Sequence, residues 1–439
     1  MFILRDLLPP LQTAFSATPL GRERAGWFLY TLLAVIVPFT SSMTSNLLRT
    51  LTTLFGLSLS QRRFYAFMAS PTLPWDRLWQ VLWGLIPAPL TDGRLVLALD
   101  DCINPKVGRQ IFGCETIFDH AAKSNQSRYP WAQNVVMVGL LKSIKGRWAC
   151  LPLAFRFYLP KKAIEAQTLN VKTGGKVPPF ETKLAQASAM IITIASHFAG
   201  VPVLVVTDSW FGNNGLFKPV REALGLQFHV LSRLRVSSML YGLPPERLPK
   251  QRGAKRKYGE KLGSVAALAS GFRDSARPYQ VRLYGKSRQV LAHRQVFMVK
   301  TLKCPVRVVW VYRKTRWVAL FTTDLRLSVE QIITLYGARW KIEIDQPCCL
   351  RRSVWDSGCD GTLPRRWVRR SRGIMDASRG RSSTRRGQCI DAAALKRAKR
   401  CSARVRLNDD AVVQAAVQAR EEGLRAGRNN ASFNGVGID

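Results

Sequence analysis

Acidic residues are scarce in this chain of 439 residues, which has 28 Asp and Glu against 67 Lys and Arg. The resulting net charge is +39 and the isoelectric point is near 10.8. An excess of this size attracts polyanions, and nucleic acid is the leading partner that it indicates. A ribosome-associated chain and a membrane-surface protein are the alternatives.

Paired cysteines and clustered histidines are also missing. The chain has nine Cys but no CxxC pair, and its four His are scattered, so a zinc site has no support. The odd Cys count favours reduced thiols in a cytoplasm over a disulfide framework. The segment GGK at 174–176 lacks the GxxxxGK[ST] spacing of a phosphate-binding loop.

No apolar run is long enough to predict a membrane span. Residues 25–48 carry no charge, but the strongly apolar part, WFLYTLLAVIV, stops before Pro38 after about a dozen residues, where a spanning helix needs ~20. It also begins too late, without a small-residue cleavage site, for a secretory signal. We therefore expect a buried helix and no membrane partner, with a membrane segment as the alternative.

Residues 1–92 are predicted to form a helical, DNA-binding domain, although no Lys occurs in residues 1–100. Trp75, Trp79 and Trp83 recur at i, i+4 and i+8, which is the spacing of one helical face. Such a stripe is typical of core packing. The residues available for phosphate contact in this domain are Arg49, Arg62 and Arg63.

Residues 93–240 show the pattern of an α/β core. A first strand at 95–99 is followed by a hairpin of strands at 134–141 and 147–159. A helix at 181–198, a strand at 201–207, a helix at 214–224 and a strand at 227–234 come next. This order predicts a mixed sheet with flanking helices.

Residues 241–327 interrupt that core with short strands and a basic loop, and indicate a β-rich insertion. Lys255, Arg256 and Lys257 in the loop are candidates for contact with DNA phosphates. A helix is predicted within residues 328–346. Residues 347–439 are Arg-rich and without helical or strand period, so we expect a largely disordered tail that is foreign to the rest of the chain.

The segment SVEQIITLYGARWKIE at 328–343 combines a helix signal with chemistry. Ser328 and Gln331 form a capping-box pattern. At about 100° per residue, Tyr336, Arg339 and Glu343 lie within roughly 60° of one another on one helical face. A surface helix with an Arg339–Glu343 pair is the alternative interpretation.

Two further carboxylates, Asp101 and Asp208, follow apolar strands. Strands of one sheet place such residues side by side, and the helix can pack Glu343 against the same edge. Three converging carboxylates need compensating cations, and hard oxygen ligands suit Mg²⁺ or Mn²⁺. Two such ions are the usual clamp for in-line displacement at phosphorus.

This set of residues resembles the bacterial DDE transposases of the insertion-sequence-4 group, whose signature helix reads Y-x2-R-x3-E-x6-K. Tyr336, Arg339 and Glu343 match it, and Phe211 matches an aromatic residue that follows the second Asp of the family. The family's first Asp closes a strand before a small polar residue, which favours Asp101 over Asp100 in LALDDC.

The resemblance covers residues 50–343 and implies an RNase H-like catalytic core with a β-rich insertion. It implies that Asp101, Asp208 and Glu343 bind two Mg²⁺ or Mn²⁺ ions, and that Tyr336 and Arg339 hold DNA phosphates. The implied reaction is metal-dependent phosphodiester hydrolysis at the ends of an insertion sequence, followed by strand transfer. A homodimer that holds two double-stranded ends is also implied.

The chain departs from the family after Glu343. The family's Lys belongs seven residues further on, where this chain has Leu350, and Pro347 is incompatible with a continuing helix. A frameshift or a fusion just after Glu343 explains both features, and translation in the other two frames distinguishes them. A catalytically inactive remnant that only binds DNA is therefore the alternative to an active transposase.

Overall fold

The computed structural model describes residues 3–345, except 37–43, 58–59, 69, 71–72, 109–110, 121, 123, 170–177 and 247–251. All of them fall within the first of the two units into which the chain divides, Met1–Cys359. The predicted tail at 347–439, with Pro347 and Leu350, lies outside the described residues. The predictions about that tail therefore stay predictions, and so do the proposed domain boundaries.

The N-terminal part is helical, as predicted. Its elements are η1 (Ile3–Leu7), α1 (Leu8–Thr13), α2 (Pro19–Ile36), α3 (Thr44–Phe55), α4 (Gln61–Met68) and α5 (Trp75–Gly84). Two small apolar clusters hold these helices together, one around Leu11 and Phe67 and one around Leu51 and Phe64. No helix in the described part of the chain has the length and apolar character needed to cross a membrane.

The tryptophan stripe on α5 is only partly a packing feature. Trp83 is buried, and its indole N–H donates to the carbonyl of Leu153 at 2.9 Å. Trp79 packs edge-on against Phe155 with ring centroids 6.0 Å apart. Trp75 is 47% exposed, so the expectation of core packing is correct for the second and third tryptophans and not for the first.

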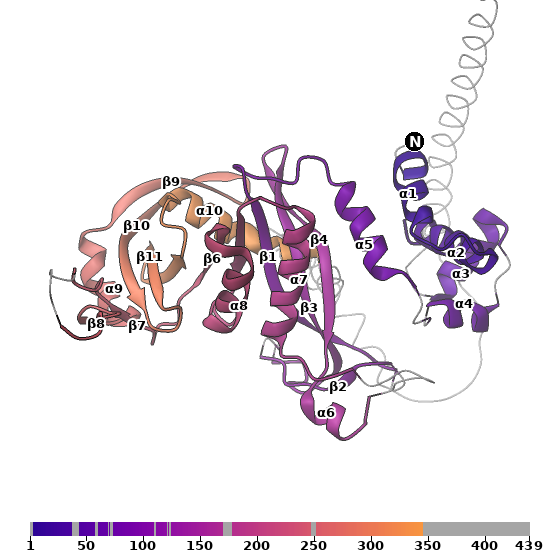
Figure 1. Ribbon diagram of the computed structural model, residues 1–439, viewed down its shortest axis with the longest axis horizontal. Helices are drawn as coiled ribbons and strands as arrows, with labels where there is room; N and C mark the ends of the chain where they lie inside the picture. The colour runs from indigo at the N-terminus through magenta and orange to yellow at the C-terminus, as the bar shows by residue number, and fades with distance from the viewer. Residues whose placement is uncertain are drawn as a thin grey trace, which may run out of the picture. The chain divides into compact units, whose positions relative to one another are not determined.

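Twelve strands form a single mixed sheet in the described residues (Figure 1). The hydrogen-bonded order is β2-β3-β1-β5-β6-β12-β11-β10-β7-β8, with β4 beside β3 and β9 beside β10. The strands are β1 (Leu95–Pro105), β2 (Cys114–Thr116), β3 (Trp131–Ile144), β4 (Arg147–Tyr158), β5 (Val203–Thr207), β6 (Phe228–Arg233), β7 (Met239–Tyr241), β8 (Lys261–Ser264), β9 (Arg277–Leu283), β10 (Lys286–Val299), β11 (Cys304–Arg313) and β12 (Arg316–Thr322).

The middle of this sheet has RNase H-like topology. Strands β1, β3 and β4 form an antiparallel meander, and β5 and β6 continue from β1 in parallel. The predicted mixed α/β fold is therefore confirmed. The strands of the predicted insertion extend this sheet, because β12 pairs antiparallel with β6 through Thr322 and Leu231. The link could not be read from the sequence, since pairing between distant strands leaves no local pattern.

Helices cover both faces of the central strands (Figure 1). The helices that follow β1 are α6 (Lys161–Glu165), α7 (Lys183–His197), α8 (Asn214–Leu224), η2 (Gly225–Gln227), α9 (Val265–Asp274), α10 (Val329–Arg339) and α11 (Lys341–Asp345). Leu97 and Val205 face a core formed with α7 and α8. Ala98 and Val206 face the opposite core, formed with α10. This alternation decides which acidic side chains meet at the strand ends.

The predicted helix at 328–343 begins as expected but is divided in two. Ser328 accepts a hydrogen bond from the backbone N–H of Gln331, whose side chain accepts from the Ser328 N–H, so the capping box is confirmed. The first helix, α10, ends at Arg339, and α11 starts at Lys341 after Trp340. Glu343 therefore lies on a separate short helix.

Candidate active site

Asp100 lies on β1, and Asp208 directly follows the adjacent parallel strand β5 on the same face of the sheet. The register of β1 and β5 pairs Ala98 with Val206 and Leu99 with Thr207, so each Asp is the next residue along the chain. Side chains alternate between faces in a strand. Both carboxylates consequently lie on the α10 side of the sheet, which Ala98 and Val206 also face.

The carboxylate of Asp208 is held in a tight turn directly after β5. Its Oδ1 accepts the backbone N–H groups of Trp210 and Phe211 at 3.0 and 3.1 Å. The hydroxyl of Ser232 on β6 donates to the Asp208 carbonyl at 2.5 Å. Gly212 permits this approach, because a Cβ there would lie 2.3 Å from the Ser232 Oγ. Local hydrogen bonds thus place Asp208 at the end of the strand.

Arg339 joins the α10 helix to the strand that carries Asp100. Its Nη1 donates to Oδ2 of Asp100 at 2.6 Å, and its Nη2 donates to Oε1 of Glu343 at 3.1 Å. The arginine side chain is only 4% exposed. Its guanidinium also lies over the rings of Tyr336 and Trp340, at 5.7 and 4.7 Å from the centroids. One buried cation therefore holds two carboxylates, one of them 239 residues away in the sequence and the other four residues away.

The electrostatics of this group are unusual for acidic residues. Burial raises the pKa of Asp100 to about 7, with Arg339 opposing the rise and the charges of Asp208 and Glu343 adding to it. Burial also raises the pKa of Glu343, again opposed by Arg339 and reinforced by Asp208. Perturbed carboxylates that act on one another are typical of functional sites. We treat Asp100, Asp208 and Glu343, with Arg339, as the candidate site and call it the acid–arginine cluster.

The structure does not bring Asp101 into this cluster, although the sequence favoured it over Asp100. The predicted strand at 95–99 in fact continues to Pro105, so neither Asp closes it. Asp101 therefore faces the opposite side from Asp100. Its Oδ2 accepts hydrogen bonds from Lys183 at 2.6 Å and from Asn134 at 3.1 Å. The choice between neighbouring aspartates depends on strand alternation beyond the apolar run.

Two groups of predicted site residues remain: Tyr336 on α10, and the basic residues Lys255, Arg256 and Lys257. Tyr336 is half-buried beside Arg339, and burial raises the pKa of its hydroxyl. Lys255, Arg256 and Lys257 are all exposed in the loop between β7 and β8. Tyr258 at the end of that loop packs against Tyr241, and the ammonium of Lys300 lies over both rings. The basic loop is thus anchored on the insertion strands.

The donor chemistry of the acid–arginine cluster suits a hard divalent cation, since its three acids offer only carboxylate oxygens. Their arrangement does not yet suit one. Within the described ranges, no three His, Cys, Asp or Glu side chains converge closely enough to hold a metal ion. The guanidinium of Arg339 instead bonds one oxygen of each of two acids, Oδ2 of Asp100 and Oε1 of Glu343. The described arrangement is therefore a charge-compensated cluster and not a preformed metal centre.

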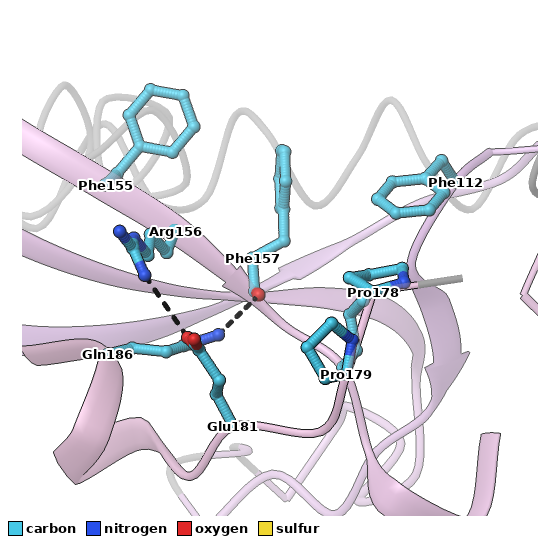
Figure 2. A pocket seen from close by; sticks show the side chains of 9 residues that line it. Phe112, Phe155, Arg156, Phe157, Pro178, Pro179, Glu181 and Gln186 are labelled. Atoms are coloured by element: carbon cyan, nitrogen blue, oxygen red, sulfur yellow. Dashed lines mark hydrogen bonds and ion pairs between the residues drawn. The ribbon is translucent and has the colours of Figure 1, made fainter. Parts of the chain in front are cut away.

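A separate pocket of about 400 Å³ opens beside β4 (Figure 2). Its lining includes the rings of Phe112, Phe155 and Phe157, together with Arg156 and Glu181, which form an ion pair at 3.2 Å. Its lining includes none of the acids of the acid–arginine cluster. The pocket therefore adds no catalytic group to the site.

A model of the DDE superfamily endonuclease family matches residues 17–289. The chain belongs to this family. A search of curated proteins found no match. The matched range contains Asp100, Asp101 and Asp208, whereas Arg339 and Glu343 lie beyond it. Membership implies a nuclease-type enzyme that acts on nucleic acid, normally with divalent metals, in agreement with the charge excess.

Sequence reasoning missed two partners in this DDE superfamily member. Lys183 and Asn134 hold Asp101 on the far face of the sheet. The only sequence signal for Lys183 is its place directly after Thr182, which caps α7 by accepting the Ala185 N–H. Reading that cap would have put the lysine in the first turn of a helix that follows the sheet.

Proposed function

We propose that this chain is a DNA transposase of the insertion-sequence-4 type, which hydrolyses phosphodiester bonds at the ends of its element and transfers the freed strands. The observation that carries the proposal is the bridge from Arg339 to Asp100 and Glu343 beside Asp208. The Tyr-Arg-Glu spacing of α10 and α11 supports the subgroup assignment. The residues that match the transposase signature thus lie beside Asp100 and Asp208.

In this proposal Asp100 takes the place first predicted for Asp101, with Asp208 and Glu343 as the other two acids. These carboxylates would hold Mg²⁺ or Mn²⁺ ions, which would supply the charge stabilisation that phosphodiester hydrolysis needs. Arg339 donates hydrogen bonds to Asp100 and Glu343. We assign it this positioning role, and its contact with a DNA phosphate stays a prediction.

The partner that we propose is double-stranded DNA, bound by a homodimer that brings two element ends together. The exposed Lys255, Arg256 and Lys257 would contact phosphates, since each neutralised phosphate contributes to affinity without reading sequence. Their loop is anchored by the Tyr241, Tyr258 and Lys300 contacts described above. An anchored basic loop suits backbone contact, because little ordering is required when DNA binds.

The test is cleavage of DNA that carries the sequence flanking the gene, in Mg²⁺ or Mn²⁺ and in EDTA. We expect metal-dependent nicking by the unaltered chain. Asp208→Asn and Asp100→Asn should abolish it, whereas the matched variant Asp101→Asn should retain measurable cleavage. Loss of cleavage in Asp101→Asn alone would refute the assignment of Asp100.

A catalytically inactive remnant that binds DNA is the second candidate. It is favoured by one observation, that Arg339 occupies the carboxylates which a metal would need. Salt-dependent binding of duplex DNA without nicking in any divalent metal would establish the remnant and reject the active enzyme. The domain boundaries proposed from the sequence are unaffected by either outcome.

A further inference from the structure

An exposed tryptophan stands at the edge of the candidate site, in the turn that holds Asp208. Trp210 is 43% exposed, although indole rings are usually buried. Its backbone is fixed at both ends, because its N–H donates to Asp208 and its carbonyl accepts from the Asn213 side chain at 2.6 Å. The ring packs edge-on against the buried ring of Phe211, with centroids 4.7 Å apart. It is therefore a rigid surface and not a loose side chain.

A lysine links this ring to a second aromatic residue. The ammonium of Lys183 lies over the ring of Trp210 at 5.7 Å and over the ring of Tyr158 at 5.1 Å. It is held there by its 2.6 Å ion pair with Asp101. Phe180, which is 38% exposed, continues the row beside Tyr158. We call Trp210, Lys183, Tyr158 and Phe180 the aromatic platform.

The platform has no role in the acid–arginine cluster. Asp101 and Lys183 lie on the α7 side of the strands, whereas Asp100 and Arg339 lie on the α10 side. Trp210 is nevertheless only two residues from Asp208, so its Cα lies within about 7.6 Å of the Asp208 Cα. A DNA strand held at Asp208 would therefore lie within reach of the indole ring.

We propose that the aromatic platform binds an unpaired nucleotide base of the DNA strand at the cleavage site, by stacking on Trp210. Proteins that bind single-stranded nucleic acid combine cations with aromatic rings in this way, because every base has a flat π-face. Bases inside a duplex stack on their neighbours and present no free face, so the platform selects DNA whose strands have separated. This inference rests on the proposed DNA substrate and adds a recognition step to it.

The experiment compares a blunt duplex with the same duplex carrying a short single-stranded extension, both in EDTA so that no cleavage intervenes. The fluorescent adenine analogue 2-aminopurine in the extension reports stacking by loss of its emission. We expect the unaltered chain to quench 2-aminopurine and to prefer the extended duplex. Trp210→Ala should lose both effects, with affinity for the extended duplex falling about 5- to 150-fold, and Trp210→Phe should keep part of each.

Three comparisons keep the outcomes distinct. Unchanged binding of the blunt duplex by Trp210→Ala shows that the variant is folded. Trp75→Ala removes a tryptophan of similar exposure, 47%, and should leave the 2-aminopurine signal as it is. The inference is overturned if Trp210→Ala quenches 2-aminopurine as strongly as the unaltered chain. It is also overturned if the variant changes the oligomeric state and leaves the quenching unchanged. Failure to bind either duplex would instead overturn the proposed function.

Discussion

Replacing the buried acid Asp100 should change how the stability of the protein depends on pH. Its side chain is 13% exposed and its pKa is about 7, against 3.8 for the ordinary value. Between these two values the folded chain keeps a proton that the unfolded chain has released. Stability therefore falls as pH rises from about 4 to about 7, and is flat on either side of that window.

The size of the effect follows from the same two values. Each unit by which a pKa differs between the folded and unfolded chain is worth about 1.4 kcal/mol. Between pH 5 and pH 8 most of the window is crossed, and the loss is about 2.5 kcal/mol. For a unit of the size of the core sheet and its helices, this corresponds to a fall of about 5 to 10 °C in melting temperature.

The measurement is tryptophan-fluorescence melting at pH 5 and pH 8 in EDTA, on the unaltered chain, Asp100→Asn and Asp101→Asn. Titrating groups distant from Asp100 contribute equally to the unaltered chain and to Asp100→Asn. The melting temperature of the unaltered chain should therefore fall relative to Asp100→Asn as pH rises, while Asp101→Asn follows the unaltered chain. If the melting temperatures of the unaltered chain and Asp100→Asn differ by the same amount at pH 5 and pH 8, the raised pKa of the buried Asp100 carboxyl is refuted.

Three further predictions concern the turn after β5, the Arg339 bridge and the basic loop. Gly212→Ala should cost about 1–3 kcal/mol of stability, because its Cβ would meet Ser232. The control is Gly271→Ala on α9, where an added Cβ would meet no atom within 4 Å. It should stabilise the protein by up to about 1 kcal/mol in thermal melts. Arg339→Lys should lose the two-pronged bridge and lower stability by about 3–5 kcal/mol, as for a broken buried ion pair, in denaturant titrations. Neutralising Lys255, Arg256 and Lys257 together should flatten the slope of log affinity against log salt by about 0.9 for each phosphate contact that is lost; an unchanged slope would exclude the loop from the interface.

Local patterns predicted the elements of this fold well. The capping box placed the start of α10 at the correct residue, and the apolar hairpin at 134–141 and 147–159 is present as β3 and β4. Both depend on neighbours in the sequence. Long-range pairings were not predictable: β12 lies beside β6, and Arg94 pairs with the buried Asp324 at 2.6 Å across 230 residues.

The sequence indicated which types of residue form the candidate site, but only part of their positions. Asp208, Arg339 and Glu343 act on one another as expected from their spacing and order. Asp101 was favoured over Asp100 by the family resemblance alone, since a strand expected to end at Leu99 leaves the alternation undefined. Once β1 continues to Pro105, one aspartate must face α10 and its neighbour must face α7. A single strand boundary thus decides which carboxylate belongs to the site.

The break at Trp340 changes what positions the third acid. In an unbroken helix, Glu343 would be placed by the helical hydrogen bonds that extend from the Ser328 cap. Here α10 ends at Arg339, and α11 has only five residues, too few to be stable alone. Glu343 is therefore placed by the burial of its neighbour Ile342 in the core and by its bond to Arg339, which Asp100 fixes in turn. Substitution of either partner should displace Glu343 as well, so the three residues act as one unit and their effects should not be additive.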